Sequence, residues 1–444
     1  MIKKMNHLPK TFLLLVCLIM SAVAGQAATT GQDQYVGVRN GQFYVEDKPY
    51  RYVGTNLWYA AILASDGEGG NRQRLGQELD CLQQLGIDNL RILVGADGRL
   101  GVPSHVRPVL QTAPGVYNDT LLAGLDRLLV ELERRGMKAV LYLNNAWEWS
   151  GGYGTYLEWA GMGNAPVPGI DGYNAYQDYV SHFVQNDKAK HMSIEHVKHI
   201  VSRVNSITGK PYTESPAIMS WQLCNEPRPF GKANKEQFAQ WLQSTARLIK
   251  SIDHNHLVST GSEGKYGCET DMELFKRLNA MPEIDYVTIH IWPYNWGWID
   301  KSSIISRVDT ACVRTCDYIA EHHAIACNLG KPLVLEEFGY PRDGFNFAPA
   351  SPTQGRDKYY DYVLSLIERT GMAAGCNFWG WGGNARPVHE SWQPGDPYTG
   401  DPAQEPQGLN SVFDVDAGTL AVIARWAKAM QAPAPAVKTQ HCTR

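Results

Sequence analysis

The sequence predicts an α/β protein: a single-domain (β/α)8 barrel, the TIM-barrel architecture, with long loops after its strands. Short apolar runs alternate with longer amphipathic stretches, and eight of each kind can be identified along the chain. The runs are short and mainly apolar, as expected for parallel strands that are covered on both faces. Eight repeats favour a closed barrel. An open doubly wound sheet is the weaker alternative, because no glycine-rich phosphate loop follows the first run.

The elements follow one another in regular order. Strands are expected at residues 51–55, 87–94, 138–143, 217–223, 257–260, 286–289, 332–336 and 374–379. Helical stretches are expected at residues 72–85, 121–135, 176–205, 235–252, 271–280, 304–328, 356–370 and 418–430. Gly86 and Gly136 end the first two helices, as glycine commonly does. Asp416 precedes the last helix, where its side chain is expected to act as the N-cap.

The two ends of the chain differ from its middle. Residues 1–27 have a basic start, an apolar run and then small residues, which is the pattern of a signal peptide. The run is too short for a membrane span, so we expect a secreted or periplasmic protein. Residues 35–430 are expected to form one domain, in which a hairpin at residues 38–47 covers the bottom of the barrel. Residues 431–444 are expected to be a flexible tail.

Composition argues against several classes of partner. The net charge of −4 is spread without blocks, so no basic stripe indicates nucleic acid. Many of the 13 tryptophans stand in loop sequence rich in Gly, Pro and Asn, and exposed indoles stack on sugar rings, which favours carbohydrate. Export permits disulfides among the cysteines, but their pairing stays open. No Cys or His cluster completes a zinc site, so no metal or cofactor is expected, and we expect a monomer.

Polar and aromatic side chains gather where the predicted strands end. In a barrel of this kind, the active site lies at the C-terminal ends of the strands. Two of these residues are glutamates on opposite sides of the mouth, Glu226 after the fourth strand and Glu337 after the seventh. Glycosidic cleavage needs such a pair, because one carboxyl group protonates the leaving oxygen while the other meets positive charge at the anomeric carbon.

Two segments carry a family resemblance. Residues 221–228 (Trp-Gln-Leu-Cys-Asn-Glu-Pro-Arg) and 335–339 (Leu-Glu-Glu-Phe-Gly) resemble the two signatures of glycoside hydrolase family 5. Residues 54–58, 144–149, 260–264 and 290–296 are similar to segments of its endo-β-1,4-mannanases. The likeness runs from about Tyr35 to about Met430. It implies retaining hydrolysis of β-1,4-mannosidic linkages in mannan, galactomannan or glucomannan by one catalytic domain.

The resemblance also implies roles for individual residues. Glu226 resembles the acid/base and Glu337 the nucleophile. Arg91 is similar to the arginine that keeps the nucleophile ionised, Asn225 to the asparagine that binds the sugar 2-hydroxyl, and His290 to the histidine beside the acid/base. The remaining positions resemble sugar-binding residues of the strand ends and loops, with Trp379 as the platform beneath the sugar and Arg228 on the acceptor side: Trp58, Trp147, Arg228, Glu263, Trp296 and Trp379.

One position departs from the family pattern. Where the family usually has a tyrosine that bonds the nucleophile, two residues after His290, this chain has Trp292. An indole N–H can donate a hydrogen bond but cannot accept one, so we expect Trp292 to support the Glu337 carboxylate. Glu336 is expected to point away from the site, because side chains alternate along a strand.

Other functions share part of this pattern. An endo-β-1,4-glucanase of the same family would carry both glutamates, and so would a transglycosylase that transfers the sugar to another sugar. A non-catalytic glycan-binding barrel would be expected to have lost one glutamate, and both are present. Residues 380–416, rich in Gly, Pro and Trp, are expected to form a loop that walls the cleft.

Overall fold

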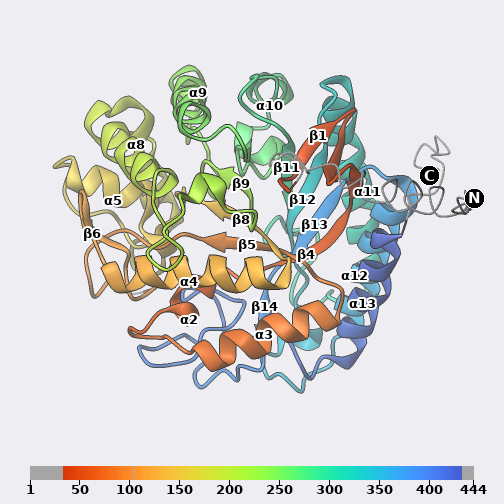
Figure 1. The fold of residues 1–444 in the computed structure, drawn as a ribbon. Coiled ribbons are helices and arrows are strands. Elements are labelled where there is room, and N and C mark those ends of the chain that lie inside the picture. Colours follow the sequence, from red (N-terminus) through yellow and green to blue (C-terminus); the bar gives the residue numbers. More distant parts are fainter. Residues whose placement is uncertain (1–33, 103, 433–444) are drawn as a thin grey trace, which may run out of the picture.

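The computed structural model describes residues 34–102 and 104–432. The predicted signal peptide at residues 1–27 and nearly all of the predicted tail lie outside them. Eight parallel strands form one sheet, and helices surround it in sequence order (Figure 1). This is the predicted barrel. Among the described residues, no helix is both long and apolar enough to cross a membrane.

The barrel strands are ordered so that each lies beside its neighbour in the chain. They are, in sequence order, β4 (Tyr52–Asn56), β5 (Asn89–Leu93), β8 (Lys138–Tyr142), β9 (Ile218–Gln222), β10 (Leu257–Ser259), β11 (Val287–Ile291), β12 (Leu333–Phe338) and β13 (Gly375–Phe378). The first and last strands pair, because Gly375 of β13 lies opposite Tyr52 of β4. Backbone bonds from Asp285 N to Val258 O and from His290 N to Glu263 O join β10 to β11. These bonds close the barrel.

The outer helices turn one apolar face to the strands. They are α3 (Arg72–Gln84), α4 (Asp119–Arg135), α8 (Asp187–Val201), α9 (Lys235–Ile252), α10 (Met272–Asn279), α11 (Val308–Asn328), α12 (Gln354–Thr370) and α13 (Ala417–Gln431). Gly136, in the left-handed conformation, ends α4 as expected. Asp416 does not cap α13 with its side chain. Its carboxylate instead accepts two hydrogen bonds from Arg342, and this buried ion pair displaces the expected cap.

Smaller elements cover the two ends of the barrel. The expected hairpin at the bottom is a three-stranded sheet, β1 (Gly37–Arg39), β2 (Gln42–Val45) and β3 (Lys48–Tyr50). Its Phe43 packs with Tyr52, Val140 and Val334 inside the barrel. The long loops at the other end contain further short elements: α2 (Ala60–Ala64), β6 (Gln111–Ala113), β7 (Val116–Tyr117), α5 (Gly152–Trp159), α6 (Pro168–Asp171), α7 (Tyr173–Val180), β14 (Trp381–Gly383) and β15 (Val412–Phe413).

Residues 380–416 form a fixed wall, which we call the wall loop. Asp401 accepts hydrogen bonds from the backbone N–H groups of Gly408, Asn410 and Ser411. Arg342 binds Asp416 through two nitrogens at 2.8 and 2.6 Å and also donates to backbone carbonyls of the loop. All these groups are buried, so the wall loop is part of the folded body.

Candidate active site

A cavity of about 440 Å³ opens at the C-terminal ends of the strands. Its walls come from the segments that follow β8, β9, β10, β11, β12 and β13 and from the wall loop. Nine of the residues expected at the site line it: Trp147, Asn225, Glu226, Arg228, Glu263, Trp292, Trp296, Glu337 and Trp379. The strand ends predicted from the sequence therefore do converge on one cavity.

Glu226 follows β9 in an unusual backbone conformation. Its φ of 49° lies in the left-handed region, which non-glycine residues adopt at some cost, often at functional sites. Its N–H donates to Gly261 O at 3.0 Å. A Cβ on Gly261 would lie 1.9 Å from Cys224 O, so only glycine allows the chain after β10 to approach this turn. Thr-Gly-Ser at residues 260–262 therefore helps to hold Glu226.

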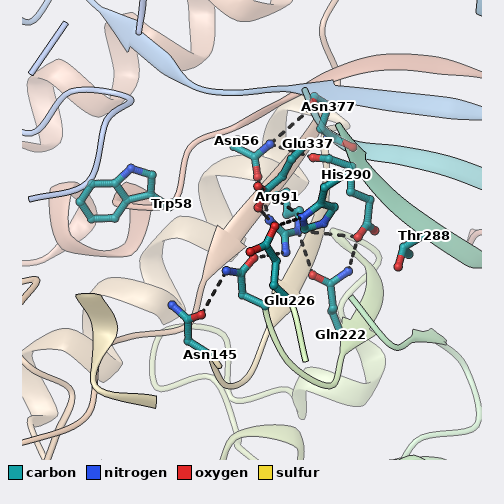
Figure 2. Close-up of polar contacts among 12 residues, drawn as sticks. Asn56, Trp58, Arg91, Asn145, Gln222, Glu226, Thr288, His290, Glu337 and Asn377 are labelled. Atoms are coloured by element: carbon teal, nitrogen blue, oxygen red, sulfur yellow. Dashed lines mark hydrogen bonds and ion pairs between the residues drawn. The ribbon is translucent and has the colours of Figure 1, made fainter. Parts of the chain in front are cut away.

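Glu337 lies in β12, facing Glu226 across the cavity. One carboxyl oxygen of each glutamate and a ring nitrogen of His290 lie within 4.8 Å of one another. Arg91 of β5 donates to Glu337 Oε1 at 2.5 Å, and Trp292 Nε1 donates to Oε2 at 3.1 Å. The hydrogen bond expected from Trp292 is therefore present. Figure 2 shows Arg91, His290 and the two glutamates converging on one point.

A Gly at position 339 permits this placement of Trp292. A Cβ there would lie 2.6 Å from Trp292 Cζ3, closer than two carbons can approach. The Glu-Phe-Gly segment of residues 337–339 thus carries both the carboxylate and the space for the indole that bonds it. Tyr294, two residues after Trp292, packs against Phe345 at 4.9 Å between ring centroids.

Glu226 has donors of its own. His290 Nδ1 lies 2.8 Å from Glu226 Oε1, and Trp147 Nε1 donates to Oε2 at 2.6 Å. Burial raises the pKa of Glu226, but the hydrogen bond and charge of His290 outweigh it and lower the pKa to about 2. For Glu337, burial outweighs His290 and Arg91, and its pKa is raised. Burial lowers the pKa of His290, but the charges of Glu337 and Glu226 raise it overall.

His290 Nδ1 and the Glu226 carboxyl group share one hydrogen bond, so a proton between them can reside on either group. Moving that proton across the 2.8 Å hydrogen bond gives neutral His290 and protonated Glu226, with no change in total charge. The pair therefore titrates as a unit. In the second form Glu226 can donate a proton, and in both forms Arg91 favours an ionised Glu337.

Arg228 and Glu263 lie on the Glu226 side of the cavity. Arg228 forms an ion pair with Glu263, and its guanidinium lies over the Trp147 ring at 5.0 Å. Burial raises the pKa of Glu263 to about 7, although Arg228 opposes it. Together, Arg228, Glu263 and Trp147 offer a cation, an acid and an indole to a sugar hydroxyl on the Glu226 side of the cavity. On the other side Trp379 is braced edge-on by Trp149 and Trp292.

Three of the residues expected at the site do not line the cavity. Trp58 is only 1% exposed, and its Nε1 donates to Gly400 O at 3.0 Å. It supports the wall loop from behind, and Figure 2 shows it apart from the carboxylates, so its assignment to substrate binding was wrong. The wall loop lies over Trp58. The sequence of residues 54–58 gives no sign of this contact. Arg91 and His290 are fully buried and contact the two glutamates rather than the cavity.

Several cavity residues were not predicted from the sequence. They come from the segment after β8, the α6–α7 region and two loops: Glu148, Trp149, Tyr173, Gln177, Asn295, Pro402, Gln404 and Glu405. Burial raises the pKa of Glu148 to about 7 and that of Glu405 to about 8, so near neutral pH either carboxyl group can donate a hydrogen bond. The Trp-Glu-Trp segment at 147–149 was a usable signal for Glu148, whereas Glu405 stands in a loop with no distinctive pattern.

Among the described residues, one set of side chains is close enough to hold a metal ion: Glu226, His290 and Glu337. Each of these groups already has a hydrogen-bonding partner. A cation there would displace the Trp147 and Trp292 donors and would be repelled by Arg91. The donor set therefore suits a pair of acids in proton transfer better than a metal site.

Comparison with known proteins assigns the family. A family model described as GH family 5 beta-mannosidase-like matches residues 33–434. The chain belongs to glycoside hydrolase family 5. A rice protein (Oryza sativa subsp. japonica) named putative mannan endo-1,4-beta-mannosidase 9 is 30% identical over 86% of this chain and 89% of its own. The Arabidopsis thaliana mannan endo-1,4-beta-mannosidase 1 is 28% identical over 84% and 88%.

Solved structures give the same family 5 assignment. The crystal structure of a glycoside hydrolase family 5 mannosidase from Rhizomucor miehei superimposes with a TM-score of 0.82. It is 32% identical in sequence, and the match covers 90% of this chain and 98% of that one. The protein is therefore a family 5 glycoside hydrolase.

Proposed function

We propose that this glycoside hydrolase cleaves β-1,4-mannosidic linkages within mannan, galactomannan or glucomannan, with retention of configuration. Glu337 acts as the nucleophile and Glu226 as the acid/base. The observation that carries the proposal is the glutamate pair in its cavity, with carboxyl oxygens within 4.8 Å. Retaining enzymes hold their carboxyl groups about 5–5.5 Å apart, and inverting enzymes about 6.5–9.5 Å, to leave room for a water molecule.

The reaction follows from the hydrogen bonds of the two glutamates. Glu337, whose carboxylate accepts hydrogen bonds from Arg91 and Trp292, attacks the anomeric carbon in its ionised form, while Glu226 gives its proton to the leaving oxygen. The charge on Glu337 disappears in the ester that forms, so Glu226 is then the base that takes a proton from water. Attack of this water on the anomeric carbon releases the sugar from Glu337 and restores both groups.

Recognition of mannose requires polar groups near C2, because mannose differs from glucose in its axial 2-hydroxyl. Asn225 lines the cavity. Its Oδ1 accepts from Arg91 Nη2 at 2.7 Å and its Nδ2 donates to Asn145 Oδ1 at 3.1 Å. These bonds fix the amide and leave its second N–H for the 2-hydroxyl. The names of the rice and Arabidopsis relatives support mannan as the polymer.

Variants of the two glutamates test the mechanism. Glu337→Ala should lose nearly all turnover while the protein keeps its fold. Glu226→Ala should still form the glycosyl-enzyme from a substrate with a good leaving group, and added azide should then yield a β-configured glycosyl azide. An α-configured azide product from the Glu226 variant would contradict the retaining mechanism.

The substrate is tested with a panel of soluble polymers. Reducing-sugar release from linear mannan, galactomannan and glucomannan should exceed release from carboxymethylcellulose at equal enzyme concentration. Equal rates on the glucan and the mannans would favour the endo-glucanase. Elongated products at high oligosaccharide concentration would favour the transglycosylase, and release of monosaccharide alone would replace endo by exo cleavage.

We also propose that the protein is exported. The proposal rests on the basic start and apolar run of residues 1–27. Mass spectrometry of protein recovered from outside the cytoplasm should find a new N-terminus close to residue 28. Recovery of the intact chain from the cytoplasm alone would contradict export.

A further inference from the structure

Glu336 is a second acid beside Glu337, and it also faces the interior of the barrel. On a regular strand, neighbouring side chains point to opposite faces. The register of β12 against β11 is interrupted at this point, because Leu335 lies opposite Ile289 and Glu337 lies opposite His290. Glu336 is the extra residue of this bulge. The expectation that it points away from the site was therefore wrong.

The Glu336 carboxyl group is completely buried. Burial raises its pKa, while the charges of Arg91 and His290 and two hydrogen bonds favour its ionised form. Gln222 Nε2 donates to its Oε2 at 2.6 Å, and the Tyr286 hydroxyl donates to its Oε1 at 3.2 Å. Its Oε2 also lies 3.8 Å from Arg91 Nε. Arg91 thus faces two carboxyl groups, Glu337 at one nitrogen and Glu336 at another.

Gln222 connects Glu336 to Arg91. Its Oε1 accepts from Arg91 Nε at 2.8 Å, while its Nε2 donates to Glu336. An amide can rotate by 180° and exchange its oxygen and nitrogen, which would turn an N–H group toward the guanidinium. Because a carboxylate can only accept, Glu336 fixes the amide with its oxygen toward Arg91.

Arg91 has little freedom left once Gln222 is fixed. Its Nη1 donates to Asn56 Oδ1 at 3.1 Å as well as to Glu337, and its Nη2 donates to Asn225 at 2.7 Å. The guanidinium also lies over the Tyr142 ring at 4.5 Å. A rotated Gln222 would disturb this plane and with it the bond to Glu337.

We infer that Glu336 is a positioning residue for the nucleophile: it orients Arg91 through Gln222, and its negative charge withdraws part of the Arg91 charge from Glu337. The inference rests on the proposed role of Glu337. A nucleophile whose charge is less completely neutralised is more basic and more reactive. Other titratable groups face Glu336 or Glu337 from the surrounding elements: Tyr52, Tyr142, Glu226, Tyr286, His290 and Glu405.

Glu336→Gln tests the charge without changing the size of the side chain. Its amide oxygen can accept from Gln222, and its N–H group can donate to the Tyr286 oxygen. With the charge removed, Arg91 acts more fully on Glu337, so the pKa of the nucleophile falls. The acidic limb of kcat/KM should move down by about 0.5–1 pH unit, with a lower kcat and an unchanged KM. A purely structural role would lower thermal stability and leave the limb in place.

Gln222→Met provides a second measurement that does not depend on folding of the first variant. It removes the link between Glu336 and Arg91, so we expect a lower kcat and an acidic limb at higher pH. Unchanged limbs in the variants that fold would overturn the inference. Glu337→Ala distinguishes failure of the proposed function from failure of the inference about Glu336. If Glu337→Ala keeps turnover, the proposed function fails. If it is inactive while the acidic limbs of the Glu336 and Gln222 variants stay unchanged, only the inference fails.

Discussion

Replacing Trp292 with Phe removes one of the two donors to the nucleophile. The lost bond is 3.1 Å long, and a hydrogen bond to a charged group contributes about 1.5–3 kcal/mol. Because the bond is at the long end of the range, we use about 1.5 kcal/mol. A pKa unit corresponds to about 1.4 kcal/mol. Losing a donor to the ionised form raises a pKa, so the nucleophile should titrate about one unit higher.

The assay is the pH dependence of kcat/KM on a soluble mannan. The acidic limb reports protonation of the essential base in the free enzyme, which is Glu337 in the proposed mechanism. Trp292→Phe should move this limb upward by about one unit. Rates should then fall about tenfold at pH values below the limb and change much less at neutral pH.

Trp296→Phe is the matched control, because its indole lines the same cavity. It has no hydrogen bond to Glu337 among those described. It should change KM without moving the limb. If Trp292→Phe leaves both the limb and the rate as they are in the unmodified enzyme, the indole does not support the carboxylate. An equal shift in the Trp296 variant would also refute the reasoning, since it would indicate a general effect of cavity polarity.

Two further predictions concern recognition and stability. Arg228→Ala should raise KM for short manno-oligosaccharides more than for polymer, because long chains have other subsites; an equal effect on both would contradict an acceptor-side role. Asp126→Asn should lower the free energy of unfolding at pH 7 by about 2 kcal/mol, the contribution of a hydrogen bond to a charged group, because Asp126 accepts two bonds from Arg203 at 2.8 and 2.7 Å and one from Tyr212. Burial raises the pKa of Asp126, but Arg203 lowers it overall, so the loss should disappear in urea titrations as pH falls through that lowered value.

The sequence predicted the barrel because its strands are buried on both faces. Residues 139–143, for example, are apolar throughout, so the strand could be predicted without any knowledge of its contacts. Strand ends differed by one or two residues at most positions. The region after β8 was harder, because α5 is rich in Gly, Tyr and Trp and lacks a clear apolar stripe. Its side chains pack against α7 and α8, which no local pattern predicts.

The candidate site was likewise predicted only in part from the sequence. Glu226 and Glu337 stand at the C-terminal ends of their strands and Arg91 lies within β5, and their meeting follows from the closure of the barrel. Trp58 and Glu336 were misplaced for different reasons. The position of Trp58 depends on a loop more than 300 residues away, through a bond that spans 342 positions. The orientation of Glu336 depends on a bulge that regular alternation cannot reveal.

The wall loop links the shape of the cavity to the cohesion of the whole molecule. Arg342 and Arg356 are completely buried, and both donate hydrogen bonds to acceptors in residues 408–416. A loop shortened through these residues would remove the Asp416 carboxylate and several carbonyl acceptors from two buried guanidinium groups, and a buried charge without its counter-charge is severely destabilising. A variant in which this loop is trimmed to widen the substrate range would therefore also need both arginines replaced. Single substitutions or short deletions are thus poor routes to a wider cavity.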